Sequence, residues 1–144
     1  MEYMHFHEGE TYMNILKTLS HLFEGRLEQK QFIVLAILMF LVNILAISIG
    51  TSLVVALGMI GLIVNDVVMF FVFIFTINLY VRRLHDIGLT GLIVVPVIVL
   101  TLLSQLFGLT LFLWLAIARG AVFKNHYGGI PSPHRSYVSA FLNN

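Results

Sequence analysis

Three long stretches of the chain carry no charged side chain: residues 31–65, 67–81 and 87–118, with Asp66 alone between the first two. As a helix, the first stretch of 35 residues would extend about 52 Å, too long for one crossing of a ~30 Å hydrocarbon core. The whole chain is 59% hydrophobic and 10% charged, whereas a soluble domain carries about 25% charged residues. These features exclude a soluble domain and a disordered chain, and they predict an all-α integral membrane bundle.

The uncharged stretches predict where the chain crosses the membrane. We expect a first span at residues 32–49 and a second at 60–81, with the first helix breaking at Gly50-Thr51-Ser52. Residues 53–59 would then extend a helix or form a short segment at the outer face. This arrangement places Asp66 about 9 Å inside the outer end of the second span. A carboxylate near the interface is less costly than one at the bilayer centre.

The basic residues predict the orientation of the spans. Arg26 and Lys30 flank the first span, so its N-terminus is expected in the cytoplasm, and two crossings then return Arg82-Arg83 to the same side. A hairpin of two short spans, turning near Ser104–Gly108, would also keep the remaining basic residues inside: Arg119, Lys124 and Arg135. We therefore favour four crossings over three, although the length of the last apolar stretch fits either. Both termini are then cytoplasmic.

We divide the chain into a cytoplasmic leader at residues 1–30, a transmembrane bundle at 31–119 and a polar cytoplasmic tail at 120–144. In the leader, Thr11–Phe23 has an apolar face, which predicts an amphipathic helix on the membrane surface or against the spans rather than one that binds a partner. The leader lacks an early apolar core, so we expect an uncleaved signal anchor. The chain has no cysteine, which excludes disulfides, and its net charge of +1 gives no reason to expect nucleic acid.

Three polar segments follow or precede the predicted spans on the cytoplasmic side, and we hypothesise that they meet as one cluster. Arg82 and Asp86 are four residues apart on a helix and can pair. Gly88 suits the position after a helix end that needs a positive φ, and Thr90 could cap the next helix. The candidate residues are Gly25, Arg26, Arg82, Arg83, His85, Asp86, Gly88, Asn125, Tyr127 and Gly128.

These segments, in this order and around these spans, resemble a bacterial inner-membrane family, domain of unknown function 805. Its pattern is F-x-G-R, then R-R-L-H-D-x-G-x-S-G, then N-x-Y-G-x-x-P, and the resemblance covers about residues 12–131. The chain departs from the pattern at Ile33, at Thr90-Gly91-Leu92 and at Ile130-Pro131, where the family has an aromatic residue, Ser-Gly-Trp and Asp-Pro. The resemblance implies a divergent multi-pass protein of the inner membrane, and it leaves the activity open.

Two roles are open for the cytoplasmic cluster. It could lock the helices together, or its arginines could bind anionic lipid headgroups. Within the membrane, Asn43, Asp66 and Asn78 would hydrogen-bond between helices or line a path for ions. The turn at Asn125–Gly128 is expected to fold Tyr127 back at the interface.

The sequence offers no nucleophile–base pair, no phosphate loop and no set of metal ligands, so we expect no enzyme, no cofactor and no metal. A lipid-modifying enzyme would need a second His or carboxylate beside His85. Our first interpretation is a small non-enzymatic membrane protein that scaffolds or regulates a partner. The second is a subunit of an oligomeric channel or transporter. The expected partners are the bilayer, anionic phospholipids, and further copies of the chain or another membrane protein.

Overall fold

The computed structural model describes residues 23–132 and 134–142, which form helices and no β-strand. In chain order they are α2 (Gln29–Leu57), α3 (Met59–Ile87), the 3-10 helix η1 (Gly91–Ile93), α4 (Val94–Leu103), α5 (Gln105–Ile117) and α6 (Tyr137–Leu142). The all-helical prediction is therefore confirmed for this part of the chain. The amphipathic helix predicted at Thr11–Phe23 lies, except for Phe23, outside the described residues.

Helices α2 and α3 form a long antiparallel hairpin that reverses at Gly58, whose φ of 58° favours glycine. Each helix has 29 residues, about 43 Å, and both are long and apolar enough to cross a membrane. The predicted break at Gly50-Thr51-Ser52 is wrong, because α2 continues to Leu57. Gly50 instead lies buried against α3, where a methyl group would overlap the side chain of Asn65. This glycine therefore lets the two helices pack closely.

A second, shorter hairpin consists of α4 and α5. The chain turns at Ser104, which has extended dihedral angles and whose Oγ accepts a hydrogen bond from the Leu106 amide. This confirms the turn predicted near residues 104–108. At 10 and 13 residues, α4 and α5 extend about 15 and 20 Å, so neither can cross a ~30 Å core alone.

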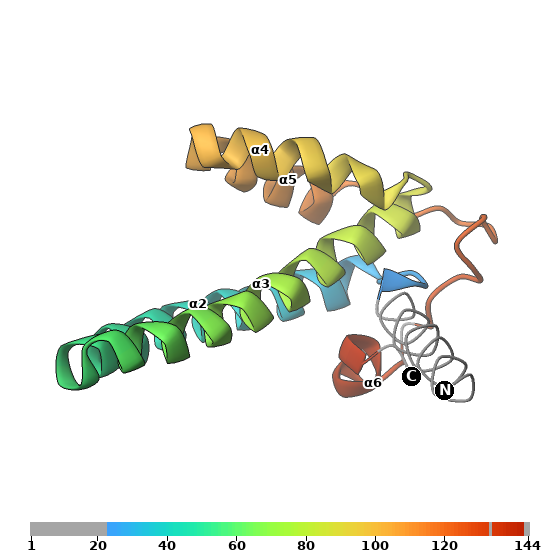
Figure 1. Cartoon of the computed structure of the whole chain (residues 1–144). Coiled ribbons are helices and arrows are strands. Elements are labelled where there is room, and N and C mark those ends of the chain that lie inside the picture. Colours follow the sequence, from blue (N-terminus) through green and yellow to red (C-terminus); the bar gives the residue numbers. More distant parts are fainter. Residues whose placement is uncertain (1–22, 133, 143–144) are drawn as a thin grey trace, which may run out of the picture.

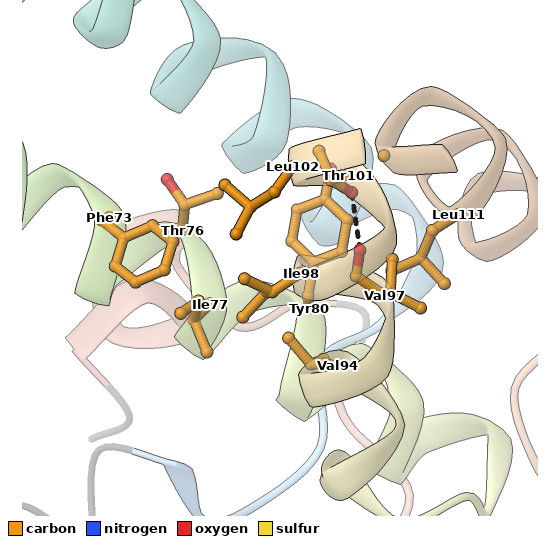
Figure 2. Close-up of a pocket in the computed structure, with 11 residues that line it drawn as sticks. Phe73, Thr76, Ile77, Tyr80, Val94, Val97, Ile98, Thr101, Leu102 and Leu111 are labelled. Atoms are coloured by element: carbon orange, nitrogen blue, oxygen red, sulfur yellow. Dashed lines mark hydrogen bonds between the residues drawn. The ribbon is translucent and has the colours of Figure 1, made fainter. Parts of the chain in front are cut away.

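The two hairpins start from a common end, where η1 follows α3, and diverge from it (Figure 1). Between them lies a cleft of about 240 Å³ with a largely apolar lining, which includes Ile77, Tyr80 and Ile98 (Figure 2). Two threonines in the cleft satisfy their hydroxyls within their own helices. Thr76 donates to the Val72 carbonyl, and Thr101 donates to the Val97 carbonyl.

The buried core lies at the common end of the hairpins. Its innermost side chains are at most 1% exposed: Leu27, Phe32, Leu79, Leu84 and Leu115. The segment predicted as a polar tail also contributes, because α6 packs beside α2 and α3 (Figure 1). Ala140 is fully buried there, and the ring of Phe141 stacks on Phe75 with centroids 5.3 Å apart. Residues 137–142 of the predicted polar tail therefore form a short helix that contributes to the core.

Candidate functional site

Asp86, near the end of α3, binds two arginines from different parts of the chain. Its Oδ1 accepts a hydrogen bond of 3.0 Å from Nε of Arg26 and lies 2.9 Å from Nη2 of the same residue, which is 60 positions away in sequence. Its Oδ2 accepts from Nη1 of Arg83. All three residues are at most 4% exposed. We call Arg26, Arg83 and Asp86 the Arg–Asp cluster.

Arg26 connects three segments. Besides Asp86, its guanidinium donates to the carbonyls of Ala121 and Phe123, the latter at 2.9 Å. The Ala121 amide in turn donates to the backbone carbonyl of Asp86 at 2.8 Å. Arg26 therefore fixes the segment before α2 to the end of α3 and to the segment after α5.

Arg83 holds the C-terminal end of α5. Its Nε donates to the Leu115 carbonyl at 3.1 Å, and its Nη2 donates to the Ala118 carbonyl. Gln29 adds a bond of 2.7 Å to the Ala116 carbonyl. The last carbonyls of a helix lack intrahelical partners and form the negative end of its dipole, so a cation and an amide donor stabilise them.

The predicted pair of Arg82 and Asp86 is wrong, because both carboxylate oxygens of Asp86 are occupied by Arg26 and Arg83. Arg82 points instead to α6, where its Nη1 donates to the Ala140 carbonyl at 2.7 Å. Arg82 is fully buried, and within the described part of the chain its Nε and Nη2 have no hydrogen-bond partner. The adjacent arginines therefore hold different helices, Arg82 binding α6 and Arg83 binding α5.

Burial shifts the pKa values of the ionisable groups that follow Val81, where the apolar part of α3 ends. Desolvation, with repulsion from Arg135, lowers the pKa of Arg82 to about 10. Burial raises the pKa of the Asp86 carboxyl, and Arg26 and Arg83 act in the opposite direction. Desolvation lowers the pKa of His85, which favours the neutral ring.

His85 joins the third polar segment to the end of α3. Its ring stacks on that of Tyr127, with centroids 3.8 Å apart and planes 2° from parallel, and its Nδ1 lies 3.2 Å from the Gly25 carbonyl oxygen. Asn125 donates to the His85 carbonyl at 2.7 Å and accepts from the Tyr127 amide at 2.9 Å. The predicted turn is present, with φ 132° at Gly128, and Tyr127 folds back onto His85.

The glycines beside the cluster have the conformations that their positions require. Gly88 has φ 91° and ends α3, with its amide bound to the His85 carbonyl and the Leu89 amide bound to the Leu84 carbonyl. This is the expected glycine-dependent helix end. Gly25 also has a positive φ, 82°. Thr90 accepts from the Leu92 amide, so the predicted cap is confirmed at η1.

The three polar residues predicted within the spans lie apart from the cluster. Asp66 is exposed on α3, and Asn43 is partly buried on α2. Asn78 is 2% exposed, and its Oδ1 has no hydrogen-bond partner among the described residues. This Oδ1 atom therefore makes none of the expected hydrogen bonds between helices.

Gly120 belongs to the site and was missed by the sequence analysis. A methyl group on this residue would lie 2.9 Å from Cγ of Asp86 and closer still to Oδ2. The only signal in the sequence was a glycine after the last apolar stretch, with no motif around it. Its role becomes visible only when α3 and the segment after α5 are placed side by side.

A comparison with protein families bears on these contacts. The family model described as "Protein of unknown function (DUF805)" matches residues 21–129. The chain belongs to the DUF805 family. The matched range of this DUF805 protein includes the whole Arg–Asp cluster and the His85–Tyr127 stack, and it ends before α6. No curated protein and no solved structure matches the chain.

Proposed function

We propose that this protein is a non-enzymatic integral membrane protein in which the Arg–Asp cluster is a structural lock. One observation supports this over headgroup binding by the same arginines. Every guanidinium nitrogen of Arg26 and Arg83 donates to an acceptor of the chain itself. An anionic headgroup could bind them only by breaking internal bonds of buried groups, which is costly.

The exposed surface supports a membrane location. Large apolar side chains cover both hairpins, and several are about 80% exposed, such as Met59 at the start of α3 and Leu102 near the end of α4. Contiguous apolar surface of this kind is unfavourable in water and suits lipid. We infer that α2 and α3 cross the bilayer and that the shorter α4–α5 hairpin enters from the cytoplasmic face and returns. The Arg–Asp cluster then lies at the cytoplasmic end, as the positive-inside rule predicts.

This topology predicts how single cysteines at three positions react with a maleimide that cannot cross the membrane. The chain has no native cysteine, so single cysteines report cleanly in the full protein. We expect Met59→Cys to react from outside, Phe123→Cys to react from the cytoplasmic side, and Leu102→Cys to react from neither. The three native residues are 80–81% exposed, so differences in labelling among the three cysteines reflect the bilayer rather than burial within the fold. Reaction of Leu102→Cys from outside would instead indicate two complete crossings by α4 and α5.

Within the membrane, we propose a scaffolding or regulatory role toward a partner. A cluster that joins α3, α5 and the segment before α2 gives a rigid base, on which apolar helix faces are presented. The alternative is a subunit of an oligomeric channel or transporter. One observation favours the alternative: Asp66 is exposed within the apolar part of α3 and could face a pore between several copies.

Ion flux separates the two proposals. We expect liposomes containing the full chain to pass K⁺ and protons at rates within about twofold of empty liposomes, because a single copy of 144 residues has little room for an aqueous path. Asp66→Asn should leave this rate unchanged. A flux well above the empty liposomes that falls about tenfold in Asp66→Asn would contradict the scaffold proposal and support a channel. The readout is dye fluorescence after an imposed gradient.

A further inference from the structure

The cleft between the two hairpins is closed near their common end and open at the other. Helices α3 and α4 form its walls, and Val94, in the lining at the start of α4, is only 5% exposed. At the opposite end, Phe73 on α3 is 47% exposed and Leu102 on α4 is 81% exposed (Figure 2). The cleft therefore opens away from the Arg–Asp cluster, toward the proposed middle of the bilayer.

The walls of the cleft offer water few hydrogen-bond partners. No described residue in its lining is charged, and the hydroxyls of Thr76 and Thr101 donate to carbonyls of their own helices at 2.8 and 2.7 Å. The other polar side chain of the lining is Tyr80, whose ring packs edge-on against Phe32 with centroids 5.5 Å apart. An internal water needs about two to four polar partners, so a cleft lined in this way favours an apolar occupant.

Close packing of α4 on α5 limits such an occupant to the space beside α3. A methyl group on Gly108 of α5 would lie 3.1 Å from Cγ2 of Thr101 on α4, which is tighter than ordinary van der Waals contact. The two short helices therefore leave no room for a chain between them, and the free space lies between their hairpin and α3 (Figure 2).

The volume of the cleft separates a hydrocarbon chain from a helix. A single turn of an α-helix, about 10 Å wide and about 5.4 Å long, occupies about 400 Å³, well above the 240 Å³ of the cleft. A methylene group takes about as much space as a water molecule, ~30 Å³, so the cleft has room for about eight of them. A segment of an acyl chain therefore fits where a partner helix does not.

We propose that this cleft binds the acyl chain of one bilayer lipid. The chain lies between α3 and α4, where it contacts Ile77 and Ile98 and supplies the dispersion contacts that these apolar walls would otherwise lack. In this position it supports the α4–α5 hairpin at its distance from α3. The inference rests on the proposed membrane insertion, because only the bilayer supplies hydrocarbon chains at this depth.

The test is photocrosslinking of the full chain in phosphatidylcholine vesicles that contain a trace of phosphatidylcholine with a diazirine in the middle of one acyl chain. We expect the strongest labelling in peptides that carry residues 73–80 and 94–102. Ile98→Trp, which fills the cleft, and Leu102→Trp, which narrows its open end, should each reduce this labelling about tenfold. The same probe on phosphatidylglycerol should label equally, because the described lining offers a headgroup no charge.

Val99→Trp and Leu103→Trp are the matched controls. Each changes the next residue along α4, and neither Val99 nor Leu103 lines the cleft. Leu103 is 78% exposed against 81% for Leu102, so this pair differs in facing the cleft rather than in exposure, and neither substitution crowds the core. Labelling that is equal in the test and control variants would overturn the site, and so would labelling spread evenly over the exposed surface of α2 and α3.

Ile98→Cys distinguishes the other possible occupants of the cleft. With an acyl chain in place, this cysteine should neither react with the impermeant maleimide nor form a disulfide with a second copy under mild oxidation. Reaction with the maleimide would show water in the cleft, and a disulfide-linked dimer would show a second copy there; either result would overturn the proposal. Maleimide labelling of Met59→Cys in the same vesicles reports insertion separately, so a failure of the membrane proposal is recognised as such.

Discussion

Asp86→Asn is expected to lower the free energy of unfolding by about 3–5 kcal/mol, because it leaves Arg26 and Arg83 buried without a counter-charge. The substitution keeps the shape of the side chain and removes only its charge. Its cost arises mainly from the two guanidinium groups, which are 4% and 0% exposed and cannot turn to water without opening the bundle. The measurement is unfolding of the full chain in mixed micelles of rising SDS content, followed by helical circular dichroism.

Asp66→Asn is the matched control for this experiment. It makes the same chemical change in the same helix at an exposed position, so its effect should stay within about 0.5 kcal/mol. If Asp86→Asn unfolded no more easily than Asp66→Asn, the Arg–Asp cluster would not be a lock. The proposal would also fail if Asp86→Asn affected only expression and left the unfolding curve unchanged.

The local features of the cluster could be predicted from the sequence because short-range rules govern them. Gly88 ends α3 with a left-handed φ, and Thr90 caps η1, since both positions depend only on neighbouring backbone groups. The turn at Ser104 could be predicted because the last uncharged stretch is long enough for two short helices, and because a hairpin keeps the basic residues after it in the cytoplasm. The meeting of Gly25-Arg26 with the end of α3 and with Asn125–Gly128 was a topological hypothesis, and the structure does bring these segments together.

The partners within the cluster could not be predicted, since they depend on packing between distant segments. Helical spacing allows Arg82 to reach Asp86, but it does not exclude a competitor 60 residues away, and Arg26 occupies that carboxylate. Likewise, Gly50 resembles a helix break in sequence, whereas its role is close packing on Asn65. A glycine alone does not distinguish a turn from a helix contact, because both need the absence of a side chain.

The same ambiguity explains why Gly120 was overlooked. In the structure, the Ala121 amide binds the Asp86 carbonyl, which draws Gly120 against the carboxylate. The space that a side chain would need is occupied by the carboxylate that holds Arg26 and Arg83. A methyl group here would therefore displace the central residue of the cluster without removing any charge.

Gly120→Ala is accordingly expected to lower the free energy of unfolding by about 3 kcal/mol, the upper part of the range for overpacking. Gly129→Ala is the control, since a methyl group there meets nothing within 4 Å. Both unfolding curves are measured as for Asp86→Asn. Because Gly120→Ala acts through contact with the Asp86 side chain, its effect should largely disappear in an Asp86→Ala background, where the carboxylate atoms that the methyl group would meet are gone. Additive losses in the double variant would show that Gly120 acts independently of the cluster, and an unchanged Gly120→Ala would contradict the close contact itself.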